Sequence, residues 1–487
     1  MEEPPSKKSN EANKIVDHPT NKLQLIANEK GLSIDSVEFA RYMDKIDPLH
    51  YLRHEFHYPK MRELYGVDLG LVDPDEDCVY FCGNSLGLCP KKAKYYTDIE
   101  MDKWAKVGVQ GHTQGDLPWV ACDEKLDTDM AKLVGGKPDE VCIMNGLTVN
   151  LHLLLISFYR PTSKRFKILC ESKAFPSDHY AFASQIQLHG FNPETAMLCI
   201  EPRKGESVIR TEDIVAKIEE EGESIAVVCF SGVQYYSGQL FDIPAITKAG
   251  HKKGCYVGFD LAHATGNVEL HLHDWDVDFA CWCSYKYLNS SAGGLGSIFL
   301  HEKHKNNTFP KLQGWWGHQL TTRFQMDNDH DPIPGAYSYR ISNTPGLLCA
   351  PLKASLEIFN KTSMKEIAAK SRLLTAYLEM RIQKRFQKDP KYTTDGSKED
   401  WKHIYVDIIT PSDVNKRGSQ LSLSFSINIS HVFKELEKRG VVCDERKPSV
   451  IRVSPAPLYC SFEDVHRFML YLDVALVAAA DYKTDNI

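Results

Sequence analysis

A lysine and an aspartate at the ends of two apolar segments could together do carbonyl chemistry. Lys286 follows the apolar run 278–283 and enters a polar, glycine-rich loop. Asp260 ends the apolar run 256–260, 26 residues before Lys286. That interval has room for a strand, a connection and a second strand. A lysine can form a Schiff base with pyridoxal phosphate (PLP), and an aspartate can keep its pyridine nitrogen protonated. The pair therefore predicts a PLP site.

Each of these residues also has a structural explanation when it is taken alone. A lysine after a strand is usually a solvated surface charge, because lysine is rarely buried. An aspartate at a strand end is often a helix N-cap or a turn residue. Only the two together, in this order and at this spacing, favour a cofactor site.

Two further segments could complete such a site. Gly146 turns a strand-like run into an apolar helix, where free backbone N–H groups and the Thr148 hydroxyl could bind a phosphate. Phe175 could stack on a pyridine ring, with Asp178 near the ring substituents. A plain N-cap and a plain turn are the structural alternatives. Ligands of open α/β sheets bind beyond the carboxyl ends of strands, so we expect both segments beside Asp260 and Lys286.

Arg452 is a charged residue inside the apolar run 450–453. Its guanidinium needs a partner, either a structural carboxylate or a substrate carboxylate bound in a bidentate manner. The loop motifs 83–87, 111–112 and 314–318 are also candidate sites. Taken individually, each of these motifs is more typical of a turn or of a packed aromatic residue.

The elements that must position these residues are short apolar runs, several of which are apolar throughout and so predict strands covered on both faces. Helix-like spans such as 211–221 and 243–253 lie between many of them. This alternation predicts an α/β domain with a mostly parallel sheet. The predicted strands are 141–144, 166–170, 196–200, 225–230, 255–259, 278–283 and 297–300.

The chain is long enough for two or three domains. We expect a disordered leader at 1–20, an N-terminal helical segment of the small domain at 21–77, a large PLP-binding α/β domain at 78–345 and a small C-terminal α+β domain at 346–487. The last of these should begin with a long helix over 352–386, followed by a polar linker from residue 388.

Composition excludes several classes of protein. The 487 residues are 43% hydrophobic and 25% charged, with a net charge of −7 and no strongly basic block, so we expect no nucleic-acid partner. No apolar run is long enough to span a membrane, and the start of the chain does not resemble a signal peptide. The fourteen cysteines are scattered, and Cys281 and Cys283 are expected to be buried thiols, so we expect no metal site and a cytoplasmic location.

Six motifs in order resemble the kynureninase family of PLP enzymes, which has the aminotransferase-like fold type I, and the resemblance runs from about residue 50 to 475. The motifs are Gly83–Gly87, Phe175–Asp178, Asp260–His263, Ser284–Asn289, Gly314–His318 and Arg452–Pro455. The resemblance implies a class V aminotransferase-like large domain with a mostly parallel seven-stranded sheet, plus the small C-terminal domain. Trp316 and the pair Ser290–Ser291 depart from the expected pattern without removing a catalytic group.

The resemblance also implies roles for individual residues. Lys286 and Tyr285 are the implied catalytic residues. The implied cofactor-binding residues are Leu147, Thr148, Phe175, Pro176, Ser177, Asp178, Ser231, Asp260, His263, Tyr285, Lys286, Trp315 and Asn343. The implied substrate-binding residues are Ser85, His112, Asn343 and Arg452. The family further implies a homodimer with its active site at the subunit interface, where Trp315 and Asn343 cross from the partner.

The activity implied is hydrolysis of the Cβ–Cγ bond of L-kynurenine or L-3-hydroxykynurenine, giving L-alanine and anthranilate or 3-hydroxyanthranilate. This reaction belongs to tryptophan catabolism and NAD biosynthesis. Another fold type I enzyme, a class V aminotransferase or a cysteine desulfurase, is the nearest alternative, although no desulfurase-like cysteine loop is found. A catalytically dead paralogue acting as a scaffold is a second alternative. A nicotinamide enzyme is the weakest, since no G-x-G-x-x-G motif follows an early strand.

Overall fold

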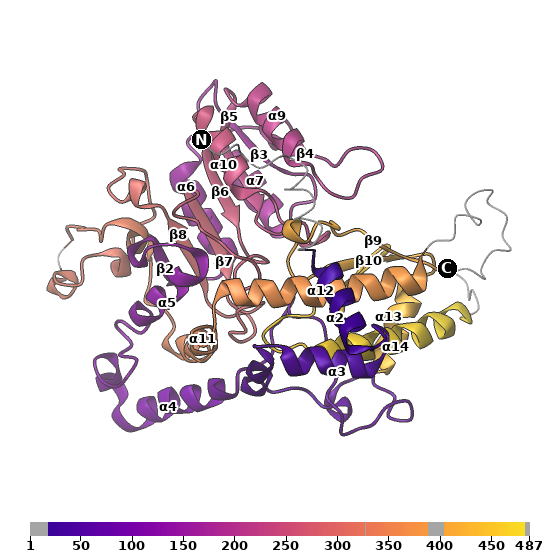
Figure 1. Ribbon diagram of the computed structural model, residues 1–487. Coiled ribbons are helices and arrows are strands. Elements are labelled where there is room, and N and C mark those ends of the chain that lie inside the picture. The colour runs from indigo at the N-terminus through magenta and orange to yellow at the C-terminus, as the bar shows by residue number, and fades with distance from the viewer. Residues whose placement is uncertain (1–17, 327, 388–403, 483–487) are drawn as a thin grey trace, which may run out of the picture. The chain divides into compact units, whose positions relative to one another are not determined.

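The computed structural model describes residues 18–326, 328–387 and 404–482, and the chain forms two compact units (Figure 1). Unit 1 combines Met1–Asn84 with Lys365–Ile487, and unit 2 is Ser85–Met364. These divisions fall some residues after the expected domain boundaries at 77/78 and 345/346. The expected domain limits stay a prediction. Most of the expected leader, residues 1–17, and the linker at 388–403 lie outside the described residues.

Unit 2 is built on a seven-stranded sheet whose order is β2-β8-β7-β6-β5-β3-β4. Strands β7, β6, β5, β3 and β4 are mutually parallel, and β8 is antiparallel to both of its neighbours, β2 and β7. The prediction of a mostly parallel seven-stranded sheet is therefore confirmed. The strands are β2 Val141–Met144, β3 Lys167–Glu171, β4 Met197–Ile200, β5 Ile225–Ser231, β6 Tyr256–Asp260, β7 Phe279–Cys283 and β8 Gly296–Leu300.

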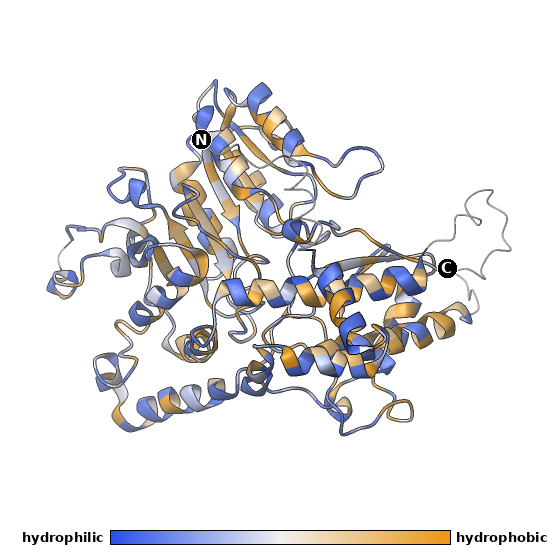
Figure 2. Ribbon diagram, in the orientation of Figure 1, coloured by the Kyte–Doolittle hydropathy of each residue, from blue (hydrophilic) through white to orange (hydrophobic). Residues whose placement is uncertain are grey.

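The helices of unit 2 are α4 Lys91–Val107, α5 Glu124–Val134, α6 Leu147–Phe158, α7 Pro176–Leu188, α8 Pro193–Ala196, α9 Thr211–Glu221, α10 Ile243–Lys252 and α11 Gly346–Phe359. Of these, α5, α6, α7, α8 and α10 contact strands of the sheet. Every residue of β2, β7 and β8 is buried, which requires cover on both faces of the sheet. In Figure 2 the strands of this sheet are accordingly mostly orange.

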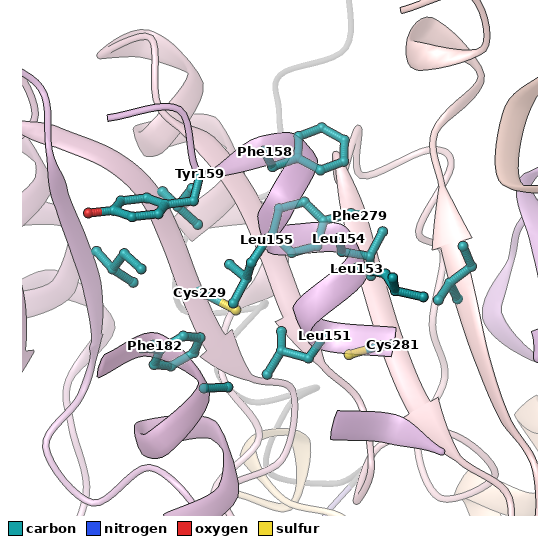
Figure 3. Close-up of a cluster of buried hydrophobic side chains, with 14 of the residues drawn as sticks. Leu151, Leu153, Leu154, Leu155, Phe158, Tyr159, Phe182, Cys229, Phe279 and Cys281 are labelled. Atoms are coloured by element: carbon teal, nitrogen blue, oxygen red, sulfur yellow. The ribbon is translucent and has the colours of Figure 1, made fainter. Parts of the chain in front are cut away.

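The core of unit 2 lies between α6 and the sheet (Figure 3). Leu151, Leu154 and Phe158 of α6 are fully buried, and the Phe158 ring stacks on Phe279 of β7 with the ring centroids 4.6 Å apart. Each fully buried leucine stabilises the fold by roughly 1.5–3 kcal/mol. This packing fixes the N-terminus of α6 against the carboxyl edge of the sheet, where the candidate site lies.

Unit 1 combines helices with two small sheets. A four-stranded antiparallel sheet has the order β12-β13-β10-β9, and β1 pairs in parallel with β11, Val79 opposite Val441. The strands are β1 Val79–Tyr80, β9 Val406–Ile408, β10 Leu421–Phe425, β11 Val441–Val442, β12 Asp444–Arg446 and β13 Val450–Val453. The helices are α2 Pro19–Lys30, α3 Val37–Ile46, α12 Met364–Phe386, α13 Ile429–Lys438 and α14 Phe462–Ala480.

The single long helix expected over 352–386 is wrong, because α11 ends at Phe359 and α12 begins at Met364. The segment 360–363 reads Asn-Lys-Thr-Ser, and such polar residues compete for backbone hydrogen bonds and so favour a helix end. Among the described residues, we find no helix with the length and apolar character that crossing a bilayer would require.

Candidate active site

The segments that follow five strands of the unit 2 sheet bring the predicted cofactor residues together at one edge. Because β8 is antiparallel to both β2 and β7, β2 points the same way as β7 and the other parallel strands. The segments after β2, β3, β5, β6 and β7 therefore meet at this carboxyl edge, as expected for a ligand site in an α/β sheet.

These segments line one cavity. Ten predicted residues take part, and Val233, Tyr235 and Ala262 line it as well. The ten are Leu147, Thr148, Phe175, Ser177, Asp178, Ser231, Asp260, His263, Tyr285 and Lys286. Val233 and Tyr235 belong to none of the sequence motifs, whereas Ala262 lies inside the motif Asp260–His263. All three lie just beyond strand ends, so the carboxyl-edge rule could have found them.

The loop that carries Lys286 is a short connection between two neighbouring antiparallel strands. It leaves β7 after Cys283 and returns as β8 at Gly296. The Ser284 N–H donates to the Leu295 carbonyl at 3.0 Å, and the Ser284 hydroxyl donates to the same oxygen at 2.5 Å. These bonds close the base of the loop and hold Lys286 at the cavity.

The last glycine of the motif 83–87, Gly87, lies against this loop. The Gly87 N–H donates to the Tyr285 carbonyl at 2.9 Å. A Cβ atom on Gly87 would stand 2.8 Å from Asn289 Cγ and closer still to the Lys286 carbonyl oxygen, inside ordinary contact distance. Only glycine fits at this approach, so Gly87 supports the lysine loop from outside the cavity.

The cavity collects more acidic than basic groups. Asp178, Asp260 and the adjacent Glu171 are buried, and Lys286 is the cation among the lining residues. Burial and the neighbouring Asp260 carboxylate raise the pKa of Asp178 well above its usual value. Asp178 Oδ1 has no hydrogen-bond partner among the described residues. A cationic ligand nitrogen would relieve this excess of negative charge.

Glu171 and Asp260 are also fixed by hydrogen bonds. The Ser231 hydroxyl donates to Glu171 Oε1 at 2.6 Å, so Ser231 joins the ends of β3 and β5. Burial raises the pKa of Glu171, although the Ser231 hydrogen bond opposes that shift. The Ala262 N–H donates to Asp260 Oδ1 at 2.7 Å, which orients this carboxylate at the end of β6.

Two helix N-termini lie on the same cavity. Gly146 is the N-cap of α6 and Phe175 is the N-cap of α7, and neither supplies a side-chain cap. The Thr148 and Ser177 hydroxyls, one from each helix, are hydrogen bonded at 2.7 Å. Uncapped N–H groups of this kind, together with hydroxyls, bind phosphate.

An aromatic wall completes the cavity. The Lys286 ammonium lies 5.8 Å from the centroid of the Phe175 ring, and Tyr235 packs edge-on against Phe175 at 5.2 Å. Phe175 is 41% exposed, so its ring can still accept a stacking partner. Burial raises the pKa of Tyr285, which keeps its hydroxyl protonated and able to donate. The residues together fit a ligand with a phosphate, a flat ring and a cationic nitrogen.

Five predicted residues of unit 2 do not line this cavity: Pro176, Ser85, His112, Trp315 and Asn343. Pro176 is the first residue of α7. His112 is exposed and packs edge-on against Trp119 at 5.4 Å. Trp315 is 47% exposed, and its indole N–H donates to the Arg323 carbonyl at 3.0 Å.

Arg452 lies on β13 of unit 1 and is 1% exposed. It forms an ion pair with Asp444, which lies directly opposite on β12 and also pairs with Arg446 at 3.0 Å. Burial lowers the pKa of Arg452, and the Asp444 carboxylate opposes that shift. The sequence leaves two possible partners for Arg452, a carboxylate of the protein and a carboxylate of the substrate, and the structure shows the first of these, Asp444.

One group of possible metal ligands lies at the opposite edge of the unit 2 sheet, where Glu140 precedes β2 and His301 follows β8. The His273 and Glu140 side chains are hydrogen bonded at 2.9 Å. The His301 ring accepts from the Lys303 N–H at 3.2 Å and contacts the His273 carbonyl at 3.2 Å. These contacts account for the ring nitrogens of His301 without a metal ion.

Comparison with known proteins places this chain in a family. Residues 367–472 match the family description "Kynureninase C-terminal domain", and residues 121–416 match "Aminotransferase class-V". The chain is 55% identical to the kynureninase of Rattus norvegicus over 458 residues, covering 94% of this chain and 97% of the relative. It is 54% identical to that of Homo sapiens over 461 residues, covering 95% and 97%.

Solved structures agree on the fold. A cysteine desulfurase from Thermococcus onnurineus NA1 superposes with a TM-score of 0.65 at 15% identity, covering 82% of this chain and 94% of that one. The enzyme C-DES with glycine covalently linked to its PLP cofactor gives 0.67 at 14% identity, covering 86% and 99%. At these identities the likeness shows the class V aminotransferase-like fold alone, whereas the full-length sequence relatives show that the chain belongs to the kynureninase family.

Proposed function

We propose that this protein is a PLP-dependent hydrolase that cleaves the Cβ–Cγ bond of L-kynurenine and L-3-hydroxykynurenine, giving L-alanine and anthranilate or 3-hydroxyanthranilate. One observation carries the proposal: Lys286 and Asp260 line a single cavity in a chain that is more than half identical to kynureninases over nearly its whole length. The reaction would serve tryptophan catabolism and NAD biosynthesis.

The residues of the cavity divide among the parts of PLP. The N–H groups of Leu147 and Thr148 and the hydroxyls of Thr148 and Ser177 would bind the phosphate. Phe175 would stack on the ring, and Asp260 would hold the proton on the pyridine nitrogen. Lys286 would hold the cofactor covalently. His263 and Asp178, both buried, would contact the remaining edge of the ring.

Proton transfer falls to two neighbouring residues. PLP, when bound, withdraws electrons from the substrate α-carbon and so makes its proton acidic. Lys286 Nζ would accept that proton, and the Tyr285 hydroxyl would donate one when the amino-acid product is completed. Partial burial raises the pKa of Tyr285, and its protonated hydroxyl supports its role as a donor. Water attacks the γ-carbonyl, and the Cβ–Cγ bond then breaks.

Substrate selection would use residues outside the cofactor cavity. Arg452 would bind the substrate α-carboxylate, and Ser85, His112 and Asn343 would surround the aromatic ring. The burial of Arg452 supports its role, because a desolvated guanidinium binds a carboxylate strongly. Asp444 already pairs with Arg452, so the substrate carboxylate would have to share or replace this partner.

We also propose a homodimer in which Trp315 and Asn343 reach the active site of the partner. Apolar side chains near Trp315 support an interface, since Phe324 is 55% and Met326 72% exposed. Mixing Lys286→Ala and Asn343→Ala subunits tests the arrangement. If each active site combines Lys286 of one subunit with Asn343 of the other, mixing should restore up to about a quarter of wild-type activity. No recovery of activity in a confirmed mixed dimer would contradict this arrangement.

We place the enzyme in the cytoplasm. None of the fourteen cysteines, all of which lie in the described part of the chain, forms a disulfide, as is usual in a reducing compartment. Fractionation of cells that express the tagged full-length chain tests this location, and enrichment in an organelle fraction would contradict it.

The decisive assay incubates purified protein and PLP with each substrate and follows the fluorescence of the aromatic product. Equimolar alanine should appear with it. L-cysteine is the control substrate, because the nearest alternative activity would release sulfur from it. Release of sulfur without cleavage of kynurenine would favour a desulfurase, and binding of PLP without any turnover would favour a catalytically dead paralogue.

A further inference from the structure

A pair of thiols lies at the outer edge of the unit 2 sheet, and neither of them lines the cofactor cavity. Cys170 of β3 and Cys199 of β4 are directly opposite each other in parallel register, and their sulfur atoms are 3.7 Å apart. Strand β4 is the last strand of the sheet. Cys199 is exposed, whereas Cys170 is buried in the core cluster.

The backbone already permits a disulfide between these residues. Paired strands lie about 4.8 Å apart, which is within the roughly 4.4–6.8 Å Cα separation of disulfides. The two sulfurs need only approach from 3.7 Å, and side-chain rotation can supply most of that movement. The pair is therefore ready to be joined without opening the sheet.

The two thiols differ in reactivity as well as in exposure. A hydrogen bond from Cys170 lowers the pKa of the Cys199 thiol, although partial burial opposes the shift. The same contact, together with burial, raises the pKa of Cys170. Thiolate is the form that reacts with peroxides, and it must be accessible to them. Cys199 therefore has the properties of an attacking thiol and Cys170 those of a resolving thiol.

We propose that Cys199 and Cys170 form a peroxide-responsive dithiol. The Cys199 thiolate attacks hydrogen peroxide, which breaks the O–O bond, leaves a sulfenic acid on Cys199 and releases one water after protonation. The Cys170 sulfur then attacks the sulfenyl sulfur. The S–S bond forms, the S–O bond breaks, and the hydroxide leaves with the Cys170 proton as a second water. One peroxide is reduced for the two electrons that the sulfurs lose, and a thiol reductant reverses the step.

The chain supplies two internal controls. Cys122 and Cys349 have sulfurs 3.5 Å apart, but both are buried, so peroxide should not reach them. Cys89 is exposed as a residue, but its thiol donates to the Pro90 carbonyl at 3.5 Å, and partial desolvation of the thiol raises its pKa. The pair Cys122 and Cys349 therefore tests two close thiols that peroxide cannot reach, and Cys89 tests an accessible thiol without a resolving thiol.

The experiment treats the holoenzyme with a small excess of hydrogen peroxide, alkylates the remaining thiols and maps the peptides without reduction. We expect one cross-linked pair, Cys170 with Cys199, lighter by two hydrogens and lost after dithiothreitol. Cys170→Ser should stop the reaction at a Cys199 sulfenic acid that dimedone traps. Cys199→Ser should leave Cys170 reduced and keep wild-type activity.

Three results would overturn the proposal. The first is full recovery of both thiols from peroxide-treated wild type. The second is oxidation of Cys89 as fast as Cys199. The third is formation of a Cys122–Cys349 bond at the same peroxide dose. All three readouts come from peptide masses, so they do not depend on the proposed hydrolase activity.

Discussion

Gly87 offers a sharp test of how the lysine loop is held, because it touches that loop from outside the cofactor cavity. In Gly87→Ala the new Cβ would stand 2.8 Å from Asn289 Cγ and closer still to the Lys286 carbonyl oxygen, whereas ordinary contact begins at 3.4 Å. Backbone φ at Gly87 is not in the positive region, so the cost of the change is steric.

The size of the effect follows from the movement required. Relieving this overlap moves the Lys286 backbone by about 1 Å, and a misplacement of that size at a reacting group costs roughly 100-fold in rate. Overpacking of this kind also destabilises by about 1–3 kcal/mol. We therefore expect kcat for kynurenine to fall roughly 100-fold and Tm to fall by several degrees.

The assay measures kcat, Tm and the visible absorbance of bound cofactor for Gly87→Ala and for a matched control, Gly70→Ala. Gly70 is exposed, its φ is also not positive, and its added Cβ would meet only the flexible Asp68 side chain at 3.2 Å. The control should behave as wild type. If Gly87→Ala kept wild-type kcat and Tm, the close approach to the lysine loop would not support catalysis, and the reasoning would be refuted.

Other variants test single roles. Lys286→Ala should lose the visible absorbance of bound cofactor and all turnover; keeping both would exclude it as the covalent anchor. Tyr285→Phe should lower kcat by roughly 100-fold or more with KM little changed, and an unchanged kcat would exclude it as proton donor. Arg452→Ala should raise KM by roughly 30-fold or more; an unchanged KM would exclude the carboxylate role. Burial alone would raise the pKa of Asp278, but hydrogen bonds from His251 and His304 outweigh it and lower that pKa. Asp278 therefore stabilises the fold above its unfolded pKa of about 3.9, and this contribution fades as the pH falls below it. The Tm of Asp278→Asn should be lower than that of the wild type at neutral pH, and the difference should narrow below about pH 4. A difference that stays constant with pH would contradict this role of Asp278.

Much of the fold was predictable because several strands of unit 2 are apolar throughout. Such runs identify strands covered on both faces, and the rule of carboxyl ends then places Asp260 and Lys286 together. The α/β class and the mostly parallel sheet followed from the pattern, whereas the aminotransferase-like fold type followed from the resemblance to a family. The break between α11 and α12 did not, because the four polar residues at 360–363 fit an exposed helix surface as well as a helix end.

The contacts that hold the site together could not be predicted from the sequence, because they join residues that are far apart in the chain. Gly87 meets the Tyr285 carbonyl across 198 residues of sequence, and Glu171 accepts from Ser231 across 60. The pairing of Arg452 with Asp444 depends on strand register, which sets the two residues directly opposite each other. Strand register is a property of the assembled sheet. From the sequence, a charged residue such as Arg452 in an apolar run therefore indicates only that its charge has a partner, and does not identify that partner.

Unit 1 combines segments from both ends of the chain, and this constrains the order in which the protein can fold during synthesis. Its first part, Met1–Asn84, leaves the ribosome before unit 2, but its second part, Lys365–Ile487, comes last. Strand β1 cannot meet β11 until residues 441–442 have been synthesised. At about 5–20 residues per second, β1 waits for some tens of seconds while unit 2 can fold. During that interval the apolar residues of the first segment lack their partners from the second segment, so we expect the nascent chain to need protection from aggregation at this stage.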